Sequence, residues 1–213
     1  MVKEQERGAL EFFPPKINLT SLRRAAKNCE GCGLYKTATQ TVFGEGKASA
    51  KVLMVGEQPG DREDRTGHPF VGPAGKLLDA ALEEAGLDRD LIYVTNAVKH
   101  FKWRPRGKRR LHEKPKAGEI DACYPWLEAE LDVIKPEVII CLGATAAQML
   151  LGRNFRVTKQ RGQWVESKYD AKVMATVHPS SILRAPDENE RERQYREFVS
   201  DLKFAAREIR NKK

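Results

Sequence analysis

The segment 108–112, Lys-Arg-Arg-Leu-His, combines three consecutive cations with a histidine two positions after the last of them. An imidazole can act as a base, a metal ligand or a nucleophile near neutral pH. The stretch belongs to a longer basic run, residues 99–116, in which nine cations minus one acid, Glu113, leave a net charge of +8. This equals the net charge of all 213 residues, so the charge excess is local. It indicates a surface that binds a polyanion, although such runs are also commonly solvated loops without a ligand.

We predict that the basic run is a loop, because Pro105, Gly107 and Pro115 interrupt any helix through it. Two aromatic residues, Phe101 and Trp103, alternate with the cations. That composition suits a nucleic acid, whose bases stack on the rings while its phosphates meet the cations. The residues expected to contact the nucleic acid are Lys108, Arg109 and Arg110.

Four cysteines form a second group of chemically active side chains. Cys29 and Cys32 are separated by two residues and flanked by glycines, which is the spacing of half a metal site. Cys123 falls in a predicted helix and Cys141 near the end of a predicted strand. We expect an intracellular chain, in which cysteines are more often metal ligands than disulfides. Spacing alone leaves zinc and iron–sulfur open, and Cys123 and Cys141 also fit buried core thiols.

Apolar patterning predicts an α/β fold. Continuous β-branched runs indicate buried strands, and apolar residues recurring every three or four positions indicate helices between them. The predicted strands cover residues 51–56, 91–95, 137–142 and 172–177, and the predicted helices cover 20–28, 73–85, 117–134, 144–151 and 187–213. The alternation predicts a three-layer α/β/α architecture around a central four-stranded parallel sheet.

Polar motifs follow these strands at the edge where a parallel sheet binds its ligands. The segment 56–61, Gly-Glu-Gln-Pro-Gly-Asp, follows the first strand, and Asn96 ends the second. The segment 178–181, His-Pro-Ser-Ser, follows the fourth strand, and the basic run leaves from the same edge. We therefore expect one composite site there, although strand-end turn chemistry alone also explains such residues singly.

Length and composition set the organisation. We predict an N-terminal arm over residues 1–17 and a single domain over residues 18–213, since 40% hydrophobic residues suffice for one core. The sequence contains neither a bilayer-length apolar run nor the apolar core of a signal peptide. We expect a cytoplasmic monomer, associated with the nucleoid when it is bound to DNA.

The motifs together resemble the uracil-DNA glycosylase superfamily, and most closely its iron–sulfur family 4 and the UdgX group within that neighbourhood. Segment 56–60 is similar to the first family motif, with Gln58 in the UdgX form where family 4 usually has Ala. Segment 178–181 is similar to the second signature. Segment 108–112 resembles the UdgX-specific loop, with Leu111 where Ile is more common. The resemblance covers about residues 29–206.

This resemblance implies roles in uracil recognition. Phe70 would stack on a uracil flipped out of the DNA, in a pocket bounded by Gly56 and Gly60. The Asn96 amide would pair with the uracil edge, and His178 would stabilise the charge that develops on O2. The alternatives are that Phe70 is a core residue, Asn96 a turn residue and His178 a structural histidine.

The resemblance also implies further DNA contacts from Ser180, Ser181 and Arg184, with Arg184 filling the space that the base vacates.

The resemblance also implies a covalent step and a cluster. His112 would attack C1′ of the sugar and stay attached to it, while Glu57 orients the imidazole and accepts its proton. Gln58 and Asp61 would hold the sugar side of the pocket. The cofactor would be a 4Fe-4S cluster on Cys29, Cys32, Cys123 and Cys141, with zinc as the alternative.

Two other functions remain open at this point. One is a glycosylase that turns over, in which water attacks the sugar and His112 only contacts DNA. The other is a non-catalytic DNA-binding module with a zinc staple. The expected partner in each case is DNA, uracil-containing for the two enzymes and including single strands.

Overall fold

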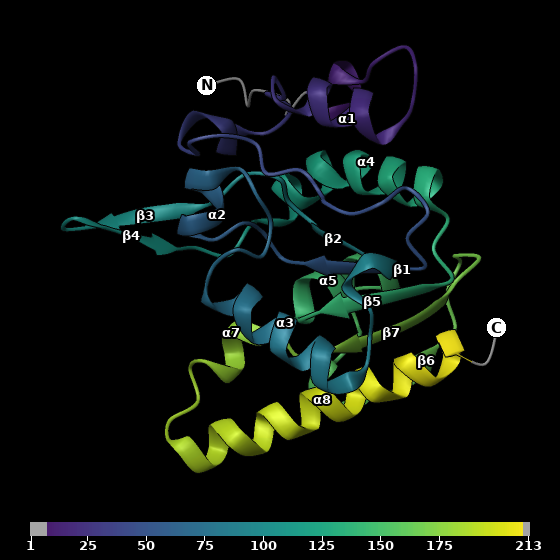
Figure 1. Ribbon diagram of the computed structural model, residues 1–213. Helices are drawn as coiled ribbons and strands as arrows, with labels where there is room; N and C mark the ends of the chain where they lie inside the picture. Colours follow the sequence, from purple (N-terminus) through teal and green to yellow (C-terminus); the bar gives the residue numbers. More distant parts are fainter. Residues whose placement is uncertain (1–7, 211–213) are drawn as a thin grey trace.

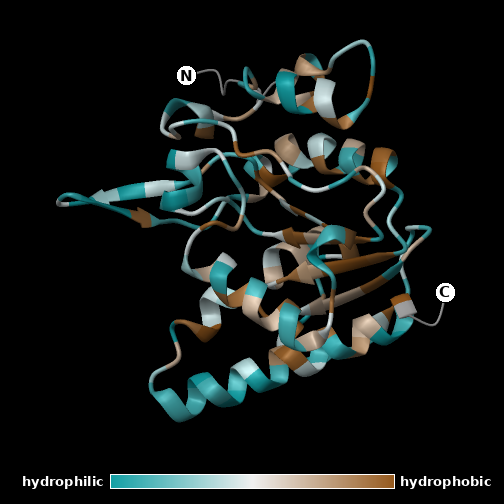
Figure 2. Ribbon diagram, viewed as in Figure 1, coloured by the Kyte–Doolittle hydropathy of each residue, from teal (hydrophilic) through white to brown (hydrophobic). Residues whose placement is uncertain are grey.

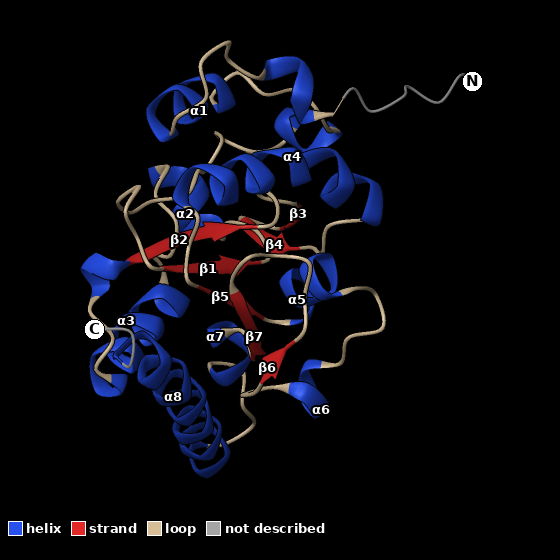
Figure 3. Cartoon of the chain, turned by 90° about the vertical axis from the view of Figure 1, so that its right-hand side faces the viewer, coloured by secondary structure: helices blue, strands red, loops and turns tan. Residues whose placement is uncertain are grey.

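The computed structural model describes residues 8–210 and contains a five-stranded sheet between helical layers (Figures 1 and 3). The strand order is β2-β1-β5-β7-β6, and β6 alone runs antiparallel. The strands are β1 (Val52–Gly56), β2 (Ile92–Asn96), β5 (Val138–Leu142), β6 (Trp164–Val165) and β7 (Lys172–Thr176). The predicted three-layer fold is confirmed, and its four parallel strands are present. The fifth strand escaped prediction because two residues are too few to form a pattern.

Alternation along each strand sorts the core into two layers. Val52 and Met54 pack toward one helical layer, whereas Leu53 and Val55 pack toward the other, as the two-residue period of a strand requires. The first layer holds α3 (Pro73–Ala85), α7 (Pro179–Ile182) and α8 (Glu188–Arg210). The second holds α4 (Ala117–Ile134), α5 (Ala144–Leu151) and α6 (Val157–Gln160). Figure 2 shows the apolar central strands and the largely hydrophilic outer side of α8.

The N-terminal segment packs on α4. Helix α1 (Leu19–Ala26) begins after Asn18, whose side chain accepts a hydrogen bond from the Ser21 amide. Ahead of it, η1 (Ala9–Phe12) leads to Phe13, whose ring centre lies 4.5 Å from that of Trp126 in α4. Residues 1–7 of the predicted arm lie outside the described residues. The remaining short elements are η2 (Gly33–Lys36), η3 (Arg89–Leu91) and α2 (Asp61–Thr66).

The central part of the basic run, residues 103–112, is a β-hairpin, so the prediction of a loop is wrong there. Strand β3 (Trp103–Arg106) pairs with β4 (Arg109–His112), and Figure 1 shows the hairpin projecting from the body. Gly107 turns the chain with a φ of 57°, a left-handed conformation that suits glycine. Pro105 fits because a two-stranded ribbon does not require its missing N–H for a further strand.

A buried ion pair joins α4 to the sheet beside the end of β2. The ammonium group of Lys99 lies 2.6 Å from a carboxylate oxygen of Glu130, and both side chains are almost fully buried. Lys99 Nζ also donates to Thr95 Oγ1 at 2.6 Å and to the Asn96 carbonyl at 2.9 Å. Lys99 is therefore an internal residue, although it belongs to the basic run.

The helices within residues 8–210 include no candidate for a membrane span, because none combines sufficient length with sufficient apolar character.

We predict that Lys99→Met lowers the free energy of unfolding by about 3–5 kcal/mol, because it leaves the Glu130 carboxylate buried without its cation. Denaturant unfolding measures this loss. Lys108→Met, at the exposed tip of the hairpin, is the control and should change stability by less than about 0.5 kcal/mol. Equal effects of the two substitutions would contradict the role assigned to Lys99.

Candidate active site

Two predicted recognition residues, Phe70 and Asn96, meet over the end of β1. Gly56 is the last residue of β1 and lies beside Asn96 of β2 in the sheet register. A Cβ at Gly56 would lie 2.3 Å from the Asn96 amide oxygen and 2.8 Å from the Phe70 ring. The glycine is therefore required for the amide and the ring to approach each other. Gly75 has the same function under the Phe70 backbone, where a Cβ would lie 1.6 Å from its carbonyl oxygen.

His178 enters the same region from the end of β7. Its ring centre lies 6.1 Å from that of Phe70, with the two rings inclined by 29°. Gly143, directly after β5, makes room for it, since a Cβ there would lie 3.0 Å from the His178 Cβ. The ends of β1, β2, β5 and β7 thus bring together a flat ring, an amide and an imidazole. This set matches the demands of a site for a planar heterocycle with polar edges.

The protonation of His178 is determined by its neighbours. The Ser180 backbone amide donates to Nδ1 at 3.1 Å, so the proton of the neutral ring is on Nε2. Burial, with smaller contributions from the charges of Arg184 and His112, lowers the pKa of His178 to about 4. At neutral pH the ring is therefore an uncharged Nε2–H donor, a group suited to stabilise a developing oxyanion.

The two serines of the second motif are directed inward. The Ser180 hydroxyl lies 2.8 Å from His178 Nδ1, and the Ser181 hydroxyl donates to the His178 carbonyl at 2.7 Å. Both hydroxyls thus hold the histidine turn, whereas phosphate contacts were predicted. Arg184 is exposed and close enough for its charge to lower the pKa of both His112 and His178, so it belongs to the same rim.

The last residue of the hairpin, His112, contacts the first motif. Its Nε2 atom lies 3.3 Å from Glu57 Oε1, and half of its side chain is exposed. The other carboxylate oxygen of Glu57 accepts a hydrogen bond from the Thr145 hydroxyl. Partial burial lowers the pKa of His112; the Glu57 carboxylate opposes this shift and Arg184 adds to it. The result is an accessible, neutral imidazole beside a carboxylate.

Gln58 fixes the open end of the hairpin. Its amide nitrogen donates to the carbonyls of Lys102 and Glu113, both at 3.1 Å, and its amide oxygen accepts from the Lys102 N–H at 3.1 Å. Lys102 and Glu113 immediately flank the hairpin strands. The buried amide of Gln58 is thus directed at the hairpin, whereas a place on the sugar side of the pocket was predicted.

Arg110, predicted to contact DNA, is instead an internal anchor. Its guanidinium lies 2.5 Å from Asp61 Oδ1 and 2.6 Å from Asp64 Oδ2, and only 13% of the side chain is exposed. It also lies 5.4 Å from the ring centres of both Phe101 and Trp103. The predicted stacking of bases on Phe101 is therefore wrong, because Phe101 is buried. Trp103 is partly exposed, and its ring contacts Arg110. Asp61 likewise holds the hairpin.

Glu63, which the sequence did not single out, joins the first motif to the Phe70 loop. It lies in α2, and its carboxylate accepts a hydrogen bond from the Gly72 amide at 2.8 Å. A Cβ at Gly60 would approach this carboxylate to 2.7 Å, so a larger residue at the end of the motif would displace the Glu63 side chain. All four residues of the segment 62–65 are charged, so the sequence does not distinguish Glu63 from its neighbours.

The charge available to a ligand is smaller than the basic run suggests. Lys99 and Arg110 are committed internally, and Lys102 pairs with Glu119 at 2.9 Å with both side chains 12% exposed. The other six cations are exposed, and they include the predicted DNA contacts Lys108 and Arg109 at the hairpin tip. The six are Arg104, Arg106, Lys108, Arg109, Lys114 and Lys116.

Three of the four cysteines lie in one cluster. Cys29, Cys32 and Cys123 are buried between the N-terminal segment and α4. The Lys99 amide lies 3.2 Å from Cys123 Sγ, and the Trp126 indole N–H lies 3.3 Å from Cys29 Sγ, so N–H donors are available to thiolates.

Cys141 does not join them, although it was predicted as the fourth ligand. It is in the middle layer of the fold, where β5 packs on α4 and α5, and it is fully buried. Within residues 8–210 no three His, Cys, Asp or Glu side chains are arranged to hold a metal ion. The chemistry of the three clustered thiols and their two N–H donors suits part of an iron–sulfur ligand set, while their positions in this structure do not form one.

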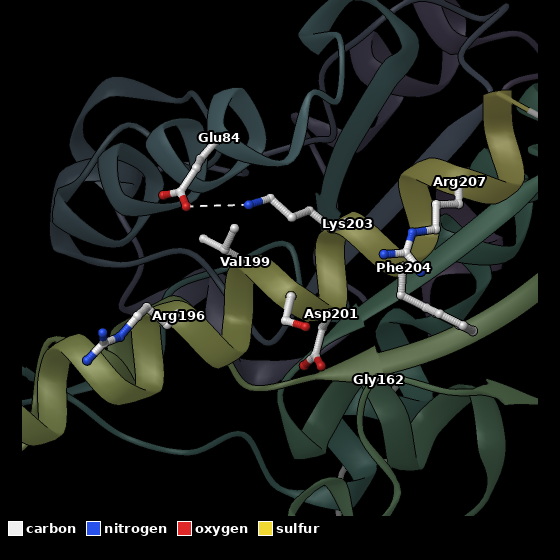
Figure 4. A pocket seen from close by; sticks show the side chains of 9 residues that line it. Glu84, Gly162, Arg196, Val199, Asp201, Lys203, Phe204 and Arg207 are labelled. Atoms are coloured by element: carbon white, nitrogen blue, oxygen red, sulfur yellow. Dashed lines mark ion pairs between the residues drawn. The ribbon is translucent and has the colours of Figure 1, made fainter.

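A hollow of about 480 Å³ along α8 is separate from this rim (Figure 4). Its walls include Lys203, which reaches toward Glu84 at 3.6 Å, and Phe204. None of the predicted site residues lines it.

Comparison with known proteins decides the family. The family model of the uracil DNA glycosylase superfamily matches residues 43–203. The chain belongs to the uracil-DNA glycosylase superfamily. The match includes all the rim motifs and leaves Cys29 and Cys32 outside.

Several members of the superfamily resemble the chain over most of its length. A Type-4 uracil-DNA glycosylase of Thermotoga maritima is 41% identical over 159 residues, which are 74% of this chain and 79% of the relative. The corresponding protein of Sulfurisphaera tokodaii is 38% identical over 178 residues, covering 80% and 78%. That of Archaeoglobus fulgidus is 36% identical over 193 residues, covering 87% and 90%.

We predict that Arg110→Ala loosens the hairpin, because it removes both ion pairs and leaves the Asp64 carboxylate buried without its cation. Hydrogen exchange of the backbone amides of residues 103–112 should become at least about tenfold faster, equivalent to 1.4 kcal/mol or more of lost local stability. Arg109→Ala removes the exposed neighbouring cation and should leave exchange unchanged. Similar exchange in both variants would show that Arg110 is no anchor.

Proposed function

We propose that this protein excises uracil from DNA and then retains the strand through a covalent bond between His112 and C1′ of the sugar. Membership of the uracil-DNA glycosylase superfamily supports excision. The observation that carries the covalent step is the contact of the half-exposed His112 imidazole with Glu57 at 3.3 Å. In that position a nucleophile stands beside a proton acceptor at the edge of the recognition site.

Recognition in this proposal uses the three side chains at the strand ends. The flipped uracil stacks on Phe70, and the Asn96 amide donates to O4 and accepts from N3–H. Cytosine presents the opposite pattern at these two atoms and is rejected. His178 Nε2–H donates to O2 as negative charge accumulates on the departing base.

The bond exchange balances within the protein–DNA complex. The C1′–N1 bond breaks and its electron pair leaves with uracil as an anion. The lone pair of an unprotonated His112 nitrogen forms the new bond to C1′. The ring then carries one excess proton, which Glu57 accepts. Imidazole bound in this way has no group at hand to expel it, so the protein reacts once.

A glycosylase that turns over is the second candidate, favoured by the Type-4 relatives. In that case Glu57 orients a water molecule toward C1′ and His112 contacts DNA. Clamping of the hairpin by Gln58 favours capture, since it holds His112 in place beside Glu57.

For the cysteines we propose a structural 4Fe-4S cluster held by Cys29, Cys32 and Cys123, with a fourth ligand other than Cys141, which lies in a separate core cluster. When bound, the cluster ties the N-terminal segment to α4 and takes no part in bond exchange. Iron and sulfide analysis of the purified protein distinguishes it from zinc. We also propose that the protein acts as a cytoplasmic monomer on the chromosome.

We predict that His112→Ala abolishes covalent capture of a uracil-containing single strand, because the nucleophile is removed. A denaturing gel after incubation measures capture as a band of reduced mobility. His68→Ala, which changes an exposed histidine paired with Glu45, is the matched control and should capture normally. Persistence of the band in His112→Ala would rule out His112, and its absence from the unsubstituted protein, with alkali-labile strand cleavage instead, would favour turnover.

The pH dependence of capture should follow the His112 ring, because only the unprotonated ring has a free lone pair. Burial lowers the pKa of His112, so the rate constant should stay level down to about pH 6.5, the ordinary histidine value, and fall only below it. Arg184→Ala removes a charge that lowers this pKa, and the fall should therefore move to higher pH. His178, with its pKa near 4, stays neutral over most of this range. An unshifted profile in Arg184→Ala would contradict the assignment.

A further inference from the structure

A groove between α4 and α5 is lined by a residue that contacts Glu57 of the proposed reaction centre. Its volume is about 690 Å³. Thr145, whose hydroxyl donates to Glu57, lines it. Lys114 and Pro115, which follow His112 by two and three residues, line it as well. The groove therefore adjoins Glu57 through Thr145, whereas none of the described residues that line the hollow along α8 contacts Glu57.

The walls of this α4–α5 groove combine an apolar floor with a cationic rim. Ile120, Met149 and Pro115 provide the apolar surface. The cations on the rim are Lys114, Arg153 and Lys168, against a single acidic residue among the lining side chains, Asp121. Asp121 lies 3.9 Å from Arg153 in an exposed pair, so the three cations and one acid leave a net charge of +2 on the lining.

Two aromatic residues place one of the cations. Lys168 Nζ lies 5.8 Å from the ring centre of Tyr124 and 5.4 Å from that of Tyr169. The two tyrosine hydroxyls lie 3.1 Å apart, which joins the loop that carries Lys168 to α4. The ammonium group of this groove-lining lysine is thus held by the two rings.

We propose that the α4–α5 groove binds nucleotides that flank the uracil in single-stranded DNA. The cations suit successive phosphates, and the apolar floor suits the faces of unstacked bases. A base-paired strand keeps its base faces stacked and cannot use this floor. The inference rests on the proposed function only in placing the uracil at Phe70, since the groove itself needs no excision to bind a strand.

The test uses the charge-reversal variant Arg153→Glu/Lys168→Glu and an uracil-free single strand of about 15 nucleotides, a length within the range of single-strand sites. Fluorescence anisotropy should show affinity at least tenfold weaker than in the unsubstituted protein. The slope of log K against log salt should become shallower by about 0.7 for each lost phosphate contact. Arg207→Glu, an exposed cation at the α8 hollow, is the control and should bind nearly as the unsubstituted protein.

Two further measurements separate this inference from the proposed function. Capture of a uracil trinucleotide, too short to fill the groove, should proceed at an unchanged rate in the double variant, and duplex binding should weaken no more than in Arg207→Glu. The proposed role of the groove is contradicted if the double variant binds the long single strand as well as the control does. It is also contradicted if the double variant loses single-strand and duplex binding equally. Failure of the unsubstituted protein to capture any uracil strand, with groove-dependent binding intact, overturns the proposed function alone.

Discussion

The site depends on the ion pairs that Arg110 makes with Asp61 and Asp64. Asp64 is fully buried, so its carboxylate needs a cation, and Arg110 brings that cation from a hairpin that would otherwise project freely from the sheet. Phe101 and Trp103 cover the guanidinium from the side and shield it from water. Gln58 then closes the hairpin at its base with three hydrogen bonds. These contacts hold the hairpin in one position on the body of the protein. Its last residue, His112, therefore lies beside Glu57.

Glycines at the ends of the strands make room for the side chains of the proposed recognition site. Gly56 lets Phe70 and Asn96 meet, and Gly143 lets His178 approach. The buried pair of Lys99 and Glu130 holds the backbone of Asn96 from beneath, and Lys99 also donates its amide to Cys123. The cysteine cluster and Asn96, for which we propose the reading of the base, are thus linked through one residue, Lys99. In the proposed function, rigid support of the Asn96 amide favours discrimination between uracil and cytosine. An amide that is out of position forms good hydrogen bonds with neither base.

Repetitive patterns were predictable from the sequence, and partners distant in sequence were not. The bounds of α3, α4 and α5 follow from apolar periodicity with Gly and Pro signals, and the parallel strands follow from β-branched runs. The hairpin was missed because its strands carry charge instead of an alternating apolar pattern. The sequence predicts a DNA contact for Arg110 because its partner Asp61 lies 49 positions away, where sequence offers no evidence of contact. Cys141 was grouped with the other cysteines by residue type, although its strand faces a separate core.

Peptide mass spectrometry of the protein after reaction with a uracil-containing strand tests the central claim most directly. Protease and nuclease digestion should leave one modified peptide, with the mass of a single abasic deoxyribose nucleotide located on His112. Free uracil should be released in equal amount to the modified protein. Modification at another residue would contradict the placement of the nucleophile. Unmodified protein with uracil released in large excess over protein would show hydrolysis with turnover in place of capture.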